Sequence, residues 1–171
     1  MLMMKRPQRY MNDLNQTSNK LGLDDILKHD TLIHSFGFNP EKCQLILDLD
    51  WIVKAEFKSG SYEYQISPST LVWDNVWDVQ FDLVTNLSIT IDDFNVLMRS
   101  TPNNVRYLSD ASYEYLISLE CLEGTIQFRT IGGKLYKRSH DYVSMNSSLS
   151  VKDRGGFSLQ PIGETFDVVI E

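Results

Sequence analysis

Five aspartates carry the most suggestive chemistry in this 171-residue chain. Asp48 and Asp50 share the polar phase of one alternating segment, and a second alternating segment carries Asp74, Asp78 and Asp82. Successive side chains of a strand point to opposite faces, so both sets would face solvent and could converge if the strands are neighbours. Like charges on adjacent strands repel unless a basic partner uses them. The five aspartates therefore predict either a binding face for a basic protein or a surface that provides solubility and protects sheet edges.

The first two aspartates also permit a catalytic interpretation. The segment Leu45-Ile-Leu-Asp-Leu-Asp-Trp51 resembles the strand-end motif of haloacid-dehalogenase-type phosphotransferases. That resemblance implies one nucleophilic carboxylate, one acid/base carboxylate and a magnesium ion between them. The chemistry needs the pair at the end of a buried parallel strand, whereas alternation here continues beyond Asp50. A small metal-assisted hydrolase or phosphatase using Asp48 and Asp50, with His29 or His34 nearby, is therefore the alternative hypothesis.

The remaining chemistry-bearing residues favour structural roles. The dipeptides His29-Asp30 and His140-Asp141 could bind a divalent ion, but no helical scaffold gathers further ligands, which favours capping or turn roles. Cys43 and Cys121 lie in the apolar phase of their strands, which predicts buried structural thiols. The basic run 134–138 is typical of a solvated strand face in an acidic chain. We expect no catalytic residues, no metal and no cofactor.

Composition and charge restrict the class of protein. The chain has 42% hydrophobic and 23% charged residues, two cysteines, a net charge of −7 and a pI near 4.9. These values fit one globular domain over residues 1–171 and argue against a nucleic-acid or anionic-membrane surface. No apolar run approaches the roughly 20 residues of a membrane span, and the first residues lack a secretory pattern. We therefore expect a cytoplasmic protein with reduced thiols.

Alternating apolar residues predict the strands that position these side chains. The longest run extends from Lys42 to Lys58, and a turn at 59–61 joins it to a strand that Pro68 ends. Another run, over 71–84, breaks at Asn75. Further strands are expected at 87–91, 113–121, 125–128 and 166–170, and a loop is expected at 102–104.

Local patterns also predict one hairpin register and two short helical segments. A helix is expected over 24–29, and Asp92 could cap a helical turn that reaches Leu97. A two-residue turn at 123–124 would join two strands. It implies these pairs: Leu122 with Thr125, Cys121 with Ile126 and Leu119 with Phe128.

Three stretches together show a resemblance: His29-Asp-Thr-Leu-Ile-His34, the Leu45–Asp50 segment, and Ile66-Ser-Pro-Ser-Thr-Leu-Val-Trp-Asp-Asn-Val-Trp-Asp78. They resemble small bacterial proteins, mostly uncharacterised, with an HD...LDLD...SPxTLxFxNVxD-like pattern. Some proteins of similar character are immunity proteins, in which an acidic face covers a toxin. The resemblance spans residues 25–82 and carries no known catalytic set.

We expect an α+β, mainly β domain in which an antiparallel sheet of seven to nine strands is curled or folded into a sandwich, with one or two short helices. The expected function is that of a non-enzymatic, immunity-like protein-binding module with a basic partner; the oligomeric state is open. Besides the metal-assisted hydrolase, ligand binding in an apolar cavity remains possible. The aromatic residues that would line it are Trp51, Trp73, Trp77, Tyr62 and Tyr64.

Overall fold

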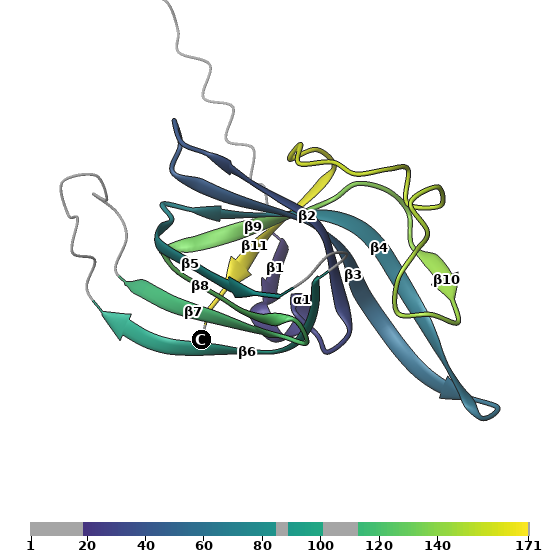
Figure 1. Ribbon diagram of the computed structural model, residues 1–171. Helices are drawn as coiled ribbons and strands as arrows, with labels where there is room; N and C mark the ends of the chain where they lie inside the picture. The colour runs from purple at the N-terminus through teal and green to yellow at the C-terminus, as the bar shows by residue number, and fades with distance from the viewer. Residues whose placement is uncertain (1–18, 85–88, 101–112, 171) are drawn as a thin grey trace, which may run out of the picture.

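The computed structural model describes residues 19–84, 89–100 and 113–170, and strands make up most of these ranges (Figure 1). Helix is confined there to the four-residue α1 (Leu23–Ile26). The strands of the described part are β1 (Asn19–Gly22), β2 (Thr31–Asn39), β3 (Gln44–Lys58), β4 (Ser61–Asp74), β5 (Trp77–Leu83), β6 (Ile89–Ser100), β7 (Glu114–Cys121), β8 (Gly124–Thr130), β9 (Gly132–Lys137), β10 (Tyr142–Ser144) and β11 (Glu164–Val169). The prediction of a mainly β, α+β fold is confirmed.

These strands form one sheet in the order β1-β11-β9-β4-β3-β2-β6-β7-β8-β5, with β10 attached to β4. Neighbouring strands run antiparallel except β1 and β11, which pair in parallel. The described part contains eleven strands, more than the seven to nine predicted. Part of the excess comes from β1 and β10. These strands have four and three residues, and segments this short show no recognisable alternation in the sequence.

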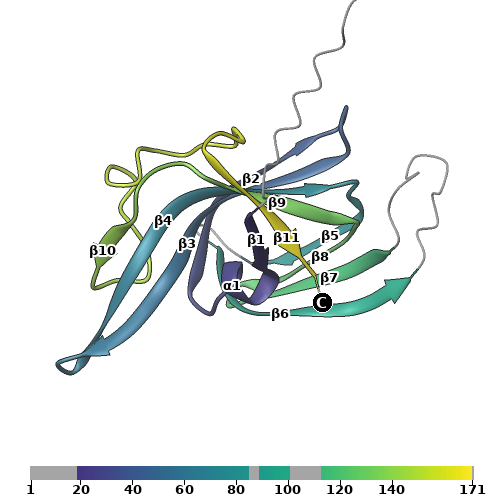
Figure 2. The ribbon, with the colours of Figure 1, turned by 180° about the vertical axis from the view of Figure 1, so that it is seen from behind.

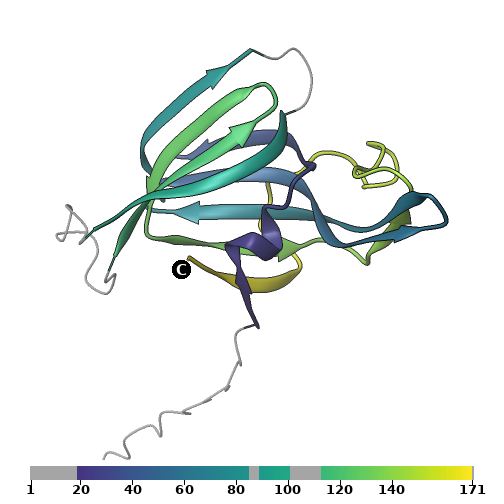
Figure 3. The same cartoon turned by 90° about the horizontal axis from the view of Figure 1, so that it is seen from below.

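A long bent ribbon gives the sheet its curl. The chain passes from β4 into β5 through residues 75–76, and from β8 into β9 through Ile131. The pairs β4–β9 and β5–β8 are therefore two halves of one antiparallel ribbon. The predicted break at Asn75 is confirmed, with a left-handed φ of 50° at the bend. Figure 3 shows the resulting sheet, in which the β6–β7–β8 part faces the β2–β3–β4 part.

The apolar core fills the concave side of this curled sheet. Leu45, Leu47 and Leu49 of β3 are fully buried there, as their alternation requires. Trp73 of β4 packs against Phe128 of β8 with ring centroids 5.3 Å apart, which joins the two parts of the sheet. Removing such apolar surface from water contributes roughly 25 cal/mol per Å² and dominates the stability of the fold.

Helical structure is scarcer than predicted. The first helix covers Leu23–Ile26 instead of 24–29, because the backbone turns at Leu27 and Asp30 before β2 begins. The predicted helical turn from Asp92 to Leu97 is wrong, since this stretch belongs to β6 and pairs with β7. Two bulges in β6, between Ile91 and Asp93 and between Val96 and Met98, break the period of two and produce a helix-like spacing.

The hairpin of β3 and β4 has the predicted turn but a longer second strand. Pro68 does not end β4, which continues to Asp74. On one side β4 pairs with β10 up to Ile66 and with β9 from Ser69 onward. Pro68 lies between these ladders, where its missing N–H leaves no ladder hydrogen bond unmade on that side.

The register of the β7–β8 hairpin differs from the prediction by two residues. Cys121 pairs with Gly124 and Leu119 with Ile126, so the turn consists of Leu122 and Glu123. A shift of two keeps the same residues on the core face, which is why the apolar pattern did not distinguish the registers. Gly124 has a φ of 135°, and a Cβ atom there would lie 2.0 Å from the carbonyl oxygen of Asp82. The strand thus requires glycine at this position.

Two features lie outside the curled body of the sheet. The first is the end of the β3–β4 hairpin, residues 53–65, which we call the arm; it projects away from the body (Figure 1 and Figure 2). The second is the loop of residues 145–160 between β10 and β11, which lies against the convex side of β3 and β4. The candidate sites belong to these two features. The predicted loop at 102–104 and Leu87 lie outside the described residues.

Candidate functional site

The structure does not bring the five predicted aspartates together on an open face. Asp48 and Asp50 are fully buried, so the prediction that they face solvent is wrong. Asp74 is half-buried and accepts a hydrogen bond of 2.7 Å from Gln44 Nε2. Asp78 is exposed but forms an ion pair with Arg129 at 3.2 Å, and Asp82 is exposed. Only the last two can contribute to a surface charge.

Asp48 lies under the 145–160 loop with both carboxylate oxygens bonded. Arg154 donates from Nη1 and Nη2 at 2.8 and 2.7 Å, and Arg138 donates from Nη2. The backbone N–H of Ser158 adds a fourth hydrogen bond at 2.9 Å. The loop therefore supplies three of the four donors that compensate this buried charge.

Asp50 completes the same cluster, which we call the ionic cluster: Asp48, Asp50, His34, Arg138 and Arg154. Asp50 accepts hydrogen bonds from Arg154 Nε at 3.1 Å and from the Leu149 N–H at 2.8 Å. Its carboxylate also lies 2.9 Å from His34 Nε2. Burial acts to raise the pKa of Asp50, but these partners outweigh it and hold that pKa below its usual value. Burial acts to lower the pKa of Arg154, and its carboxylate partners raise it overall.

The ionic cluster holds the 145–160 loop on the sheet and leaves no accessible carboxylate pair. His34 and Arg138 are only 8% and 9% exposed, and the other three side chains are not exposed at all. Within the described residues, no three His, Cys, Asp or Glu side chains are grouped so that they could hold a metal ion. The arrangement can stabilise a covering loop, but it offers no free oxygen for a substrate or an ion.

The structure also places the two cysteines, the His140-Asp141 dipeptide and the basic run 134–138. Cys43 is exposed in the β2–β3 turn, so its predicted burial is wrong, whereas Cys121 is half-buried and burial raises the pKa of its thiol to about 12. His140 packs on Tyr142 at 4.5 Å, and Asp141 forms an ion pair with Lys137 at 2.8 Å. The basic run 134–138 is therefore partly neutralised.

The arm carries exposed aromatic side chains on one face. Phe57 is 66% exposed and Tyr62 is 52% exposed, and their ring centroids lie 5.3 Å apart in an edge-on arrangement. Tyr64 follows at 6.0 Å from Tyr62. These rings alternate with charged residues on the opposite face, where Lys54 and Lys58 pair with Glu56 and lower its pKa to about 2. The arm thus presents a polar face and an aromatic face.

A hollow of about 350 Å³ continues the aromatic face at the base of the arm. The turn between α1 and β2 forms its other wall, where His29 lies between two carboxylates, 3.0 Å from Asp30 and 2.8 Å from Asp92. The hydrogen bond that His29 Nδ1 donates to the Asp30 carboxylate is the main cause that raises the pKa of His29. The residues that line the hollow are Lys28, His29, Asp30, Ile52, Ala55, Tyr62 and Tyr64.

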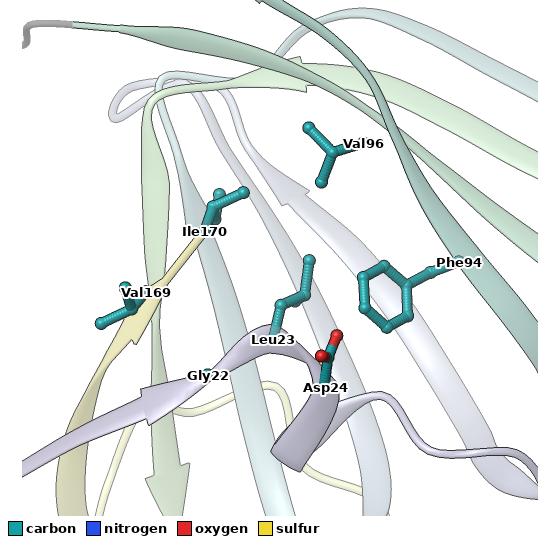
Figure 4. A pocket seen from close by; sticks show the side chains of 7 residues that line it. All are labelled: Gly22, Leu23, Asp24, Phe94, Val96, Val169 and Ile170. Atoms are coloured by element: carbon teal, nitrogen blue, oxygen red, sulfur yellow. The ribbon is translucent and has the colours of Figure 1, made fainter.

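A second hollow, of about 100 Å³, lies where α1 meets β6 and β11 (Figure 4). Leu23, Phe94 and Ile170 point toward it, with Asp24 beside them. Because Leu23 and Ile170 are buried parts of the core, this hollow is a packing gap rather than a surface that presents chemistry. Trp51 and Trp73 are likewise buried in the core, whereas Tyr62 and Tyr64 line the hollow at the arm.

Comparison with known proteins gives no match for this chain among family models, curated proteins or solved structures. None of the helical structure in the described ranges has the length and apolarity of a membrane span. The function therefore has to be argued from the geometry of the chain itself.

Proposed function

We propose that the protein is a non-enzymatic protein-binding module and that the arm is its binding element. The observation that carries the proposal is the aromatic face formed by the exposed Phe57 and Tyr62 and the half-buried Tyr64 beside them, on a hairpin that projects from the body (Figure 1). Neighbouring exposed aromatic groups often mark interaction sites, and tyrosine is enriched among the residues that dominate binding energy. The ion pairs on the opposite face of the arm keep that face hydrated and leave the aromatic face to bind.

The net charge of −7 favours a basic partner, because a charged molecule steers an oppositely charged one during diffusion. An immunity-like inhibitor of a basic toxin is the form of this function that small size and acidity support. The burial of Asp48 and Asp50 gives the hydrolase alternative no support from geometry, since all their oxygens already have partners inside the protein.

Site-specific photo-crosslinking tests the proposal. A photoreactive phenylalanine analogue at position 57 should capture a discrete basic partner from the native source, whereas the analogue at Leu122, which is 68% exposed in another hairpin, should not. Binding of that purified partner should weaken at least tenfold in Phe57→Ala and Tyr62→Ala and remain unchanged in Leu122→Ala. Equal capture at both positions, or full affinity in both arm variants, would refute the role of the arm.

A further inference from the structure

The hollow at the base of the arm combines aromatic faces with a carboxylate. We infer that it binds the guanidinium group of an arginine side chain presented by the basic partner, an inference that rests on the proposed function. The hollow has a volume of about 350 Å³ and opens beside Tyr62, the ring that also belongs to the exposed aromatic face. A partner lying along the arm would therefore have the hollow within its reach.

The tyrosines supply the first part of the recognition. The Tyr62 and Tyr64 rings lie 6.0 Å apart with 33° between their planes, and both line the hollow. A planar, weakly hydrated guanidinium stacks on such rings, because the negative face of the ring attracts the cation. Ile52 and Ala55 provide apolar surface for the methylene stem of the same side chain.

Asp30 supplies the second part of the recognition, a carboxylate that can accept hydrogen bonds from the guanidinium. Its side chain is 39% exposed on the wall of the hollow, and only Oδ1 has a partner among the described residues, the Nδ1 atom of His29. The backbone N–H of Asp30 donates to the Ile91 carbonyl at 2.9 Å, which fixes the turn against β6. A held carboxylate with an unused oxygen is a suitable acceptor for a guanidinium N–H.

The cations already present on the wall have partners of their own. Lys28 Nζ donates to the carbonyl oxygens of Ile52 and Val53, each at 3.0 Å. Both ring nitrogens of His29 face carboxylates, those of Asp30 and Asp92. When His29 is protonated, its charge opposes an incoming guanidinium and partly neutralises the carboxylates of Asp30 and Asp92; both effects disappear once His29 loses the proton. Arginine binding should therefore strengthen as the pH rises through the pKa of His29.

The test uses N-acetyl-arginine amide, whose only charge is the guanidinium, with N-acetyl-citrulline amide as the neutral isostere. Chemical-shift titration of the full chain should show saturable shifts at Tyr62, Tyr64 and Asp30 with the arginine probe at millimolar concentration, and none with citrulline. Asp30→Asn should reduce the affinity at least threefold, while Asp93→Asn, an exposed carboxylate outside the hollow, should leave it unchanged.

Other outcomes overturn the inference and remain distinct from failure of the proposed function. Equal shifts with citrulline, stronger shifts with N-acetyl-leucine amide, or no shifts with any probe would each remove the arginine site. None of these results alters the crosslinking outcome at position 57, which reports on the arm alone. Conversely, arginine binding without partner capture at position 57 would retain the hollow as a cation site and reject the arm as a protein-binding element.

Discussion

Arg154 is the residue on which the covered face of the sheet depends. Its guanidinium is fully buried and bonds both Asp48 and Asp50 as well as the Gly156 carbonyl oxygen at 2.9 Å. Removing one partner of a buried ion pair leaves an uncompensated charge, which is more damaging than losing the pair itself.

Arg154→Met should therefore destabilise the protein by about 3–5 kcal/mol. Lys152→Met is the matched control, since Lys152 is exposed on the same loop, and its unfolding free energy should change by less than about 0.5 kcal/mol. Urea unfolding measures both variants. A loss below about 1 kcal/mol in Arg154→Met would mean that the ionic cluster does not hold the loop.

The lowered pKa of Asp50 predicts a loss of stability in acid. Because the folded-state pKa lies below the unfolded value of about 3.9, the stabilisation is fully present above that value and is lost as the pH falls through the folded-state pKa. Unfolding free energies measured between about pH 5 and pH 2 should fall less steeply in Asp50→Asn than in the native protein. Asp82→Asn, at an exposed site, should retain the native slope.

At the scale of elements, two glycines in hairpins should respond differently to alanine. Gly60 has a φ of 92° with nothing within 4 Å of a Cβ atom, so Gly60→Ala should cost about 1 kcal/mol through backbone strain alone. Gly124→Ala adds a collision with the Asp82 carbonyl and should cost more than Gly60→Ala, with loss of β5–β8 pairing. Thermal unfolding and amide exchange of β5 measure the two effects; equal losses would contradict the close approach.

Strands in which a long run of alternation surrounds any bulge could be predicted from the sequence; a short strand interrupted by a bulge could not. β7 follows a period of two closely, and β3 does so on both sides of a bulge at Val53, so both strands are expected at nearly the observed bounds. In β2, the bulge at His34 places Ile33 and Phe36 three residues apart on one face, so no strand was predicted.

The ionic cluster was missed for a different reason. Asp48 and Arg154 are 106 residues apart, and the 145–160 loop has no periodic pattern. Alternation indicates which side chains share a face, but it does not indicate whether a later segment covers that face. The arm was partly predictable, since its turn and its alternating tyrosines were recognised, although its projection from the body was not.

At the scale of the whole molecule, net charge should control the rate of association with a basic partner. Of the five predicted aspartates, only Asp78 and Asp82 remain available at the surface. The double variant Asp78→Asn/Asp82→Asn should keep its melting temperature within about 2 °C, because exposed charges contribute little to folding.

The association rate of that double variant should fall and depend less on salt concentration. Stopped-flow mixing with the partner captured at the arm measures both quantities. An unchanged rate at low salt would show that steering does not use these carboxylates.

The long separation between Asp48 and Arg154 also sets an order of events during synthesis. At about 5–20 residues per second, a ribosome adds the 106 residues that follow Asp48, up to and including Arg154, in roughly 5–20 s. Throughout that interval the carboxylates of β3 have no guanidinium from the loop, and β1 has not met β11, its parallel neighbour from the other end of the described chain. A nascent chain that stops before the loop would hold a sheet with a charged, uncovered face, so native structure should become protease-resistant only after the last strand has left the exit tunnel.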